Sequence, residues 1–309
     1  MAKERNLPLD YAVYLICRCI DMVFHCLPIE VDLQIARAMG SLLYLADRKH
    51  RRRGISNIRR SFPDSTERQC RALARESLQQ MVMLAVEMLF TTNLIRIDTF
   101  ARHIEFENFT EVLELLIRRD TGLIMLTGHY GNWEILGYVL ATLGFETTSI
   151  ARPLDNPYVN RWILGVRKRQ GQKIVAKKGA TDEVIPVIEA KGAVGFIADQ
   201  NAGSKGVFVD FFGRKASTYK SIALLAMEYQ VPIVVGYARR GGQAFHFHLG
   251  VQDIIYPANW ENQPDPLRYI TQRYSKALED VVRKDPAQYL WVHRRWKTRP
   301  KGEAAEKYD

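Results

Sequence analysis

Two patterns of apolar and polar residues alternate along the chain. Short apolar runs that end in glycine or polar residues are typical of buried strands, and apolar residues recurring at helical spacing predict helices. From residue 65 onward the two patterns follow each other in turn. Helices are predicted at 65–94, 133–143, 157–170, 181–190, 219–229 and 266–284, and strands at 121–127, 147–151, 173–176, 193–198, 231–238 and 245–249.

This alternation predicts an α/β fold class with a mainly parallel central sheet flanked by helices. In such sheets, ligand sites lie at the carboxyl ends of the strands. His129, Arg152 and Asp199 each follow a predicted strand directly, so we expect them at one edge of the sheet. The chain contains no G-x-G-x-x-G motif, which gives a dinucleotide site little support.

The N-terminal stretch 11–27 is apolar but is interrupted by Arg18, Asp21 and His25, which fall on one face of a helix. A membrane-crossing helix needs about 20 apolar residues, and charges at mid-depth are costly. A signal peptide matches poorly, because its apolar core lacks such charges. We therefore predict an N-terminal apolar helix whose narrow polar stripe faces protein or lipid headgroups. An amphipathic helix buried in a soluble core is the alternative.

The strand predicted at 121–127 ends in a glycine turn that presents His129 and then Glu134. A neutral histidine can act as a general base when a partner on its second ring nitrogen fixes its tautomer. The spacing makes Glu134 a candidate for that partner. The amides of Gly131 and Asn132 precede a predicted helix and are candidates for receiving developing negative charge. This loop suits acyl transfer, and a structural histidine is the alternative.

Charge and cysteine content limit the classes of partner. The formal net charge is +10, and the basic residues gather at 48–53, 59–60, 167–178 and 294–301. Such clusters attract anionic headgroups, phosphorylated substrates or nucleic acid. No helix-turn-helix, zinc-finger or ribonucleoprotein pattern is present, so we expect no nucleic-acid partner. The four cysteines form no metal-binding or redox spacing, and we predict neither a disulfide framework nor a metal site.

Several short motifs occur in a fixed order along residues 54–299. They are N-I-R-R-S-F-P at 57–63, H-Y-G-N-W-E at 129–134, A-R-P at 151–153 with N-P at 156–157, A-D-Q at 198–200, V-F-V-D-F-F-G at 207–213 with S-T at 217–218, and Y-L-W-V-H-R-R-W-K at 289–297. In this order they resemble the bacterial lipid A late acyltransferases, the lauroyl and myristoyl transferases that acylate a lipopolysaccharide precursor. The histidine motif has a glutamate at its acid position, as is familiar in this branch of the glycerolipid acyltransferases.

The resemblance implies a site that transfers a fatty acyl chain from a thioester to a hydroxyl. It implies His129 and Glu134 as the catalytic pair. Asp199 is a second catalytic carboxylate, which would support the imidazole or bind the acceptor. The residues expected to bind substrate are Arg152, Gly131, Asn132, Gln200 and Phe211; Arg152 suits a phosphate or the oxyanion because its guanidinium is a fixed fork of donors. Phe211 would line an acyl tunnel or belong to the core. We expect His293 to pack a helix end.

The predicted function is a membrane-associated O-acyltransferase at the cytoplasmic face of the cell inner membrane. Residues 1–50 would form a membrane-associated helical segment and residues 51–309 the acyltransferase domain. The expected partners are acyl carrier protein or acyl-CoA as donor, a lipid acceptor and an anionic membrane surface, with no cofactor. Two alternatives stay open: transfer to another lipid, such as a lysophospholipid, an ornithine lipid or a phosphoglycolipid, and a noncatalytic lipid-binding protein of the same fold.

Overall fold

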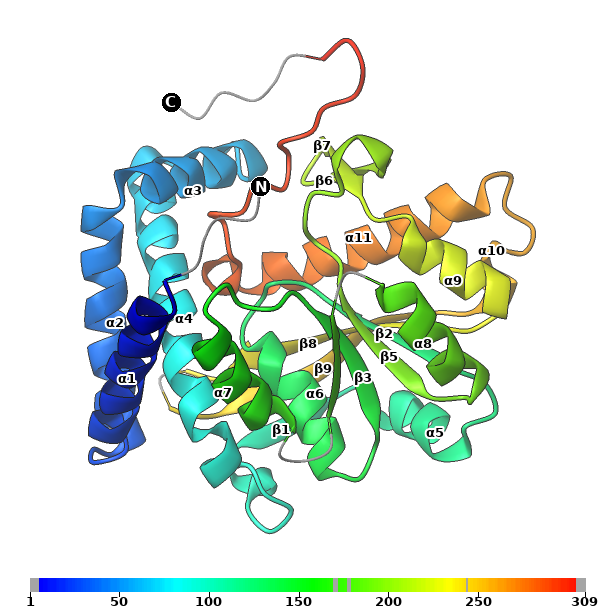
Figure 1. Cartoon of the computed structure of the whole chain (residues 1–309). Helices are drawn as coiled ribbons and strands as arrows, with labels where there is room; N and C mark the ends of the chain where they lie inside the picture. The colour runs from blue at the N-terminus through cyan, green and yellow to red at the C-terminus, as the bar shows by residue number, and fades with distance from the viewer. Residues whose placement is uncertain (1–5, 169–171, 177–178, 243, 304–309) are drawn as a thin grey trace.

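A seven-stranded sheet lies at the centre of the computed structural model, which describes residues 6–168, 172–176, 179–242 and 244–303 (Figure 1). The strand order is β1-β9-β8-β2-β5-β3-β4, and every neighbouring pair is parallel except β8 and β9. The strands are β1 (Ile104–Glu107), β2 (Leu123–Thr127), β3 (Thr147–Ala151), β4 (Lys173–Ala176), β5 (Ala193–Ile197), β8 (Ile233–Arg240) and β9 (Phe247–Ile255). The predicted mainly parallel sheet is confirmed.

Helices cover both faces of this sheet. They are α5 (Thr110–Arg118), α6 (Trp133–Thr142), α7 (Pro157–Lys168), α8 (Ala180–Glu189), α9 (Ser221–Tyr229), α10 (Pro257–Trp260) and α11 (Pro266–Lys284). Alternate residues of each strand point to opposite faces. In β2, Ile124 and Leu126 pack with α8, α9 and α11, whereas Leu123 packs with α5 and α6. The predicted end of α7 at Gln170 lies outside the described residues, as do Arg169, Lys177 and Lys178 of the basic cluster.

Four helices precede the first strand and stand at one end of the sheet (Figure 1). They are α1 (Leu7–Phe24), α2 (Ile29–Ala46), α3 (Arg48–Ser61) and α4 (Glu67–Leu94). Helix α2 packs along the much longer α4. An N-terminal capping box at Thr66 and Gln69 begins α4, because each side chain binds a backbone N–H of the other.

Helix α1 turns its polar stripe toward α7. Arg18 lies over the ring of Trp162 at 5.1 Å, and Tyr14 contacts Tyr158. His25 stacks on Phe90 of α4 with ring centroids 4.6 Å apart. Among the residues of α1 only Phe24 is buried, so the helix is not a buried element of a soluble core. Along the described parts of the chain, every helix is too short or too polar to cross a bilayer.

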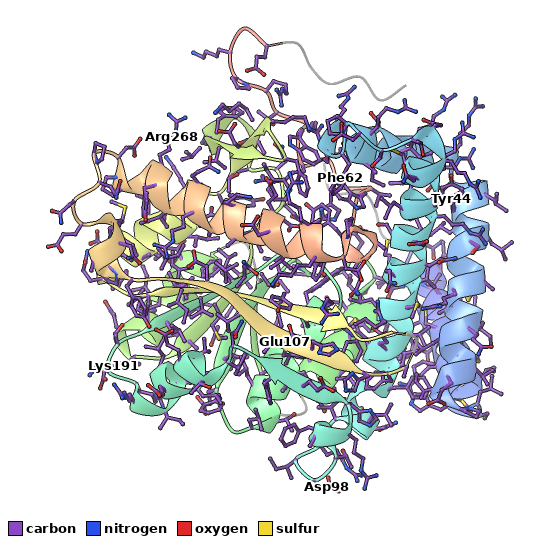
Figure 2. All side chains as sticks on the ribbon, turned by 180° about the vertical axis from the view of Figure 1, so that it is seen from behind. Tyr44, Phe62, Asp98, Glu107, Lys191 and Arg268 are labelled. Atoms are coloured by element: carbon purple, nitrogen blue, oxygen red, sulfur yellow. The ribbon has the colours of Figure 1, made fainter. Side chains whose placement is uncertain are left out.

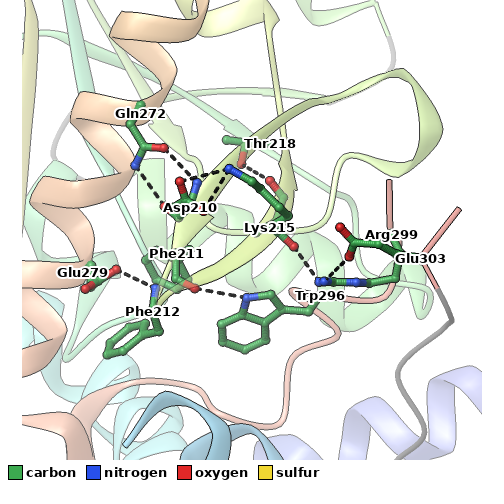
Figure 3. Close-up of polar contacts among 11 residues, drawn as sticks. Asp210, Phe211, Phe212, Lys215, Thr218, Gln272, Glu279, Trp296, Arg299 and Glu303 are labelled. Atoms are coloured by element: carbon green, nitrogen blue, oxygen red, sulfur yellow. Dashed lines mark hydrogen bonds and ion pairs between the residues drawn. The ribbon is translucent and has the colours of Figure 1, made fainter. Parts of the chain in front are cut away.

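A hairpin of β6 (Val207–Phe211) and β7 (Arg214–Thr218) lies beside α11 and the C-terminal segment (Figure 3). The backbone N–H of Phe212 donates to Glu279 of α11, and the indole of Trp296 donates to the carbonyl of Phe211. Phe211 itself is 1% exposed and packs in the core against Trp296. The structure therefore places Phe211 in the core, and it does not line the apolar cavity described below.

Candidate active site

The ends of two neighbouring parallel strands bring His129 and Asp199 together. His129 follows β2 and Asp199 follows β5, and these strands pair in register up to Thr127 and Ile197. The Nδ1 atom of His129 lies 2.7 Å from one carboxylate oxygen of Asp199. The backbone N–H of His129 donates to the other oxygen at 2.8 Å. One carboxylate thus fixes both the ring and the backbone of the histidine.

Asp199 is an ionised carboxylate at neutral pH. Its side chain is 1% exposed, and this burial by itself would raise its pKa. The attraction to His129 and the hydrogen bonds from it outweigh the burial and hold the pKa of Asp199 well below its ordinary value. An ionised Asp199 can only accept a hydrogen bond, so Nδ1 of His129 carries the proton that it donates and the lone pair lies on Nε2. The imidazole is therefore oriented as a general base.

Glu134 does not contact the ring of His129, so the predicted pairing is wrong. It lies in the first turn of α6 and forms two hydrogen bonds with Arg167 of α7, at 2.8 and 2.7 Å. The helix directs the glutamate away from the loop that carries the histidine. The role of imidazole partner, which the sequence left open between two carboxylates, is taken in the structure by Asp199.

Exchange of Asp199 for asparagine should lower kcat by about 10²–10⁴-fold, because an amide can hold the wrong imidazole tautomer and cannot stabilise the imidazolium. Glu134→Gln is the matched control, because it also removes one carboxylate charge, from a residue that bonds to Arg167 and not to the imidazole. We expect the smaller loss of kcat in the control. Steady-state kinetics of both variants decide the point, and an equal or larger loss in Glu134→Gln would contradict the assignment.

The amides of Gly131 and Asn132 are already bonded, which corrects their predicted use as oxyanion donors. Gly131 N–H donates to the carbonyl of Gln288 at 3.0 Å, and Asn132 N–H donates to that of Ala238 at 2.9 Å. Gly131 has φ +55°, and a Cβ there would lie 1.9 Å from the Ala238 oxygen. Only glycine fits this turn. These residues hold the loop in shape.

A buried ion pair supports the histidine loop through the side chain of Asn132. Glu87 of α4 and Arg240 of β8 form two hydrogen bonds of 2.5 and 2.6 Å, and both side chains are fully buried. The Asn132 amide donates to Glu87 at 2.9 Å, while its oxygen caps α6 by accepting from Ile135 N–H. Gln288 binds the backbone of Arg240 in both directions. The loop is thereby tied to α4, β8 and the C-terminal segment.

Two polar side chains face His129 on its open side. The ring of His293 lies 4.3 Å from the ring of His129, centroid to centroid. Burial and the neighbouring His129 lower the pKa of His293 to about 4, so it is neutral at pH 7. The amide nitrogen of Gln200 lies 3.4 Å from Nε2 of His129. Gln200 was predicted in the site, whereas His293 was expected at a helix end and is a further residue of it.

Arg152 pairs with a residue of its own loop. Its side chain is 79% exposed on the loop after β3, and its ion-pair partner is Asp155 at 3.5 Å. Because β3 lies next to β5 in the sheet, Arg152 leaves the same edge as Asp199, and its role in binding substrate stays a prediction.

An apolar cavity opens beside the histidine loop, between α6, α7 and the sheet. It holds about 810 Å³ of atom-free space, its mouth included. Trp133 lines it and also contacts the ring of His129, with centroids 4.8 Å apart. Its lining includes the partly exposed pair of Glu134 and Arg167 and the buried Leu140 and Val234. Such walls suit an apolar part of a ligand.

A sequence profile described as "Bacterial lipid A biosynthesis acyltransferase" matches residues 2–298. The chain belongs to this family. It is 25% identical to a lipid A biosynthesis acyltransferase of Haemophilus influenzae over 282 residues, which cover 89% of this chain and 85% of that one. A lipid A biosynthesis lauroyltransferase and a myristoyltransferase of Escherichia coli K12 are 23% and 24% identical, covering 89% and 87% of this chain and 88% and 82% of theirs.

Membership in the lipid A acyltransferase family makes this protein an acyltransferase, as the resemblance in the motifs implied. The noncatalytic alternative is therefore set aside. The match runs from residue 2 to residue 298, so it covers the helices α1–α4 as well as the sheet.

Proposed function

We propose that this acyltransferase moves a fatty acyl chain from a thioester donor to a hydroxyl of a lipid A precursor, with His129 as the general base. The observation that carries the proposal is the hydrogen-bonded pair of His129 and Asp199 beside an apolar cavity. The acceptor class is supported by the names of the relatives, which act in lipid A biosynthesis.

In the proposed reaction, Nε2 of His129 takes the proton of the acceptor hydroxyl, and the oxygen attacks the thioester carbonyl carbon. A C–O bond forms and the carbonyl oxygen becomes an oxyanion. The intermediate then collapses, the C–S bond breaks, and the leaving thiolate takes the proton back from the imidazolium. Asp199 stabilises the imidazolium throughout, because it is anionic and bonded to Nδ1.

The oxyanion needs donors other than the loop amides, which are already bonded. The carboxamide of Gln200 and the neutral ring of His293 are the polar groups that face His129. We assign them this role, since a neutral imidazole can donate a hydrogen bond to an oxyanion without carrying charge. In the free protein, the Gln200 amide covers the lone pair on Nε2 and must turn away as the acceptor hydroxyl enters.

The apolar cavity is proposed to hold the acyl chain. Ser149 lies on its wall midway along β3. Ser149→Phe should shorten the usable cavity and lower transfer of long chains by roughly tenfold relative to short ones, as one added ring displaces several methylene groups. Competition between thioesters of different length measures this ratio. Ser149→Ala, which leaves the space open, is the control, and an unchanged ratio in Ser149→Phe would contradict the assignment.

The exposed apolar residues of α1 and α2 are proposed to lie in the membrane surface at the cytoplasmic face of the inner membrane. Large apolar patches on a protein surface mark interaction sites, and amphipathic helices of this kind lie in the bilayer interface. The residues are Leu7, Leu9, Tyr11, Val13, Leu15, Ile16, Ile20, Met22 and Val23 of α1, and Val31, Ile35, Met39, Leu42 and Leu45 of α2. Both helices would place the cavity and the histidine near the lipid acceptor.

A donor comparison tests the proposed reaction. Purified protein in detergent is offered one acyl chain on acyl carrier protein or on coenzyme A, with a lipid A precursor, and thioester loss is followed. Faster consumption with one donor, dependent on the precursor, identifies that donor. Loss that is independent of the precursor but needs His129 would keep the chemistry and redirect the search to lysophospholipid, ornithine lipid or phosphoglycolipid acceptors.

A further inference from the structure

An arginine-lined groove lies where α2 ends, α3 runs and α4 begins, away from the histidine site. It is lined by Tyr44, Arg48, Arg51, Arg52, Ile55, Ser56, Arg59, Arg60, Glu67 and Arg71. Six of these residues are arginines and one is an acid. The guanidinium groups line a concave surface, whereas the charged side chains of an ordinary solvated face lie on a convex one. This arrangement suits an anion with several oxygen atoms.

The positive charge of the groove is only partly compensated by the protein. Glu67 pairs with both Arg59 and Arg71. Among the residues that the structure describes, the side chains of Arg48 and Arg52 make neither a hydrogen bond nor an ion pair to protein. Their guanidinium groups therefore keep their donors available for a ligand.

Arg51, which lines the groove, ties α3 to the end of α2. It donates to the carbonyls of Tyr44 and Leu45 at 2.8 and 2.7 Å, which satisfies the end of α2, and its guanidinium lies over the ring of Tyr44. The turn between α2 and α3 is fixed further by Asp47, which accepts from the backbone N–H of His50 at 3.0 Å. The arginines on α3 consequently project from a rigid helix.

The groove lies between the proposed membrane face and the histidine site. On one side, Leu42 and Leu45 of α2 are 64% and 67% exposed and belong to the apolar surface. On the other side, Asn57 of α3 donates to the carbonyls of Trp291 and His293 at 2.8 and 3.1 Å. One helix thus carries arginines on its outer face and holds the segment of His293 on its inner face.

We propose that this groove binds the phosphate group of an anionic lipid headgroup in the leaflet on which the protein lies. Guanidinium forks match phosphate oxygens in pairs, and basic residues beside a membrane-inserted apolar surface bind anionic headgroups. The continuity with Leu42 and Leu45 favours a lipid over a soluble anion. The inference rests on the membrane placement of α1 and α2 given above, but it needs no turnover.

The test measures binding of the full-length protein to vesicles of phosphatidylcholine, with and without phosphatidic acid. The variant Arg48→Glu/Arg52→Glu should lose roughly tenfold or more of the added affinity that phosphatidic acid gives. Its binding to pure phosphatidylcholine, which the apolar surface provides, should not change. Both positions are exposed and outside the histidine site, so the fold and the thioester turnover in detergent should persist.

Lys191→Glu/Arg268→Glu is the control of equal charge change. Both residues are exposed and lie at the opposite end of the molecule from Tyr44 (Figure 2). An equal loss in this control would reduce the effect to net charge and overturn the proposal. The proposal is also overturned if inorganic phosphate, at the same concentration as the phosphatidic acid, abolishes vesicle binding, because the groove would then bind a soluble phosphate. It is overturned as well if the groove variant binds both kinds of vesicle like the native protein and loses only thioester consumption with acyl carrier protein as donor. Weak binding of all variants to pure phosphatidylcholine would contradict the membrane placement instead.

Discussion

Replacement of His129 by alanine is expected to lower the rate of acyl transfer by about 10²–10⁴-fold, the usual contribution of a general base. In the proposed reaction Nε2 of His129 faces the acceptor hydroxyl, and the neighbouring His293 cannot replace it, because His293 has a pKa of about 4 and is a weak base. Thioester consumption with donor and acceptor both saturating measures the loss in kcat.

His246→Ala is the control for this loss. His246 belongs to the rim of the sheet and pairs with Glu105 at 3.3 Å, far in sequence from either active-site strand. The thermal unfolding midpoint of His129→Ala is expected to fall, because the buried carboxylate of Asp199 keeps only the backbone N–H of residue 129 as a partner, so turnover is compared well below both midpoints. Turnover near that of the native protein would remove His129 from the mechanism.

Replacement of Arg240 by methionine is expected to destabilise the protein by about 3–5 kcal/mol, because it leaves the carboxylate of Glu87 buried without a counter-charge. Both side chains are fully buried, so solvent cannot compensate. The same change should also reduce turnover, since Glu87 holds the Asn132 side chain behind the histidine loop. Urea unfolding followed by tryptophan fluorescence measures the free energy.

The double variant Glu87→Gln/Arg240→Met separates the charge from the packing. Glutamine still accepts from Asn132 but carries no charge, so the double variant should recover part of the stability lost in Arg240→Met. If the double variant is no more stable than the single one, the buried charge is not the cause, and the loss comes from packing around Arg240.

The sheet could be predicted from the sequence because its central strands are continuous apolar runs. Residues 121–127 and 193–198 were placed within two residues of β2 and β5. The strand β1 was missed because I-E-F-E at 104–107 is short and half charged, which is typical of an edge strand and of a loop alike. The hairpin of β6 and β7 was missed because its aromatic residues were weighed only as a cavity lining or as core; the structure places Phe211 in the core against Trp296.

The sequence predicted most residues of the site, but not which of them contact each other. The strand-end rule placed His129 and Asp199 at one edge, but spacing along the chain favoured Glu134 as the partner of the histidine. A loop followed directly by a helix sends residue 134 outward along α6, and only the pairing of β2 with β5 brings Asp199 to the ring. His293 could not be found in this way, because its approach depends on how the C-terminal segment crosses the sheet.

Mass-spectrometric analysis of the lipid product tests the central claim most directly. Native protein is incubated with a lipid A precursor and an acyl thioester carrying an isotopic label, and Asp199→Asn and His129→Ala are run beside it. We predict a product heavier by one labelled acyl chain, ester-linked to a precursor hydroxyl, in the native reaction and at most traces in both variants. Equal product in the native protein and the variants, or labelled fatty acid without labelled lipid, would contradict transfer by this histidine to this acceptor.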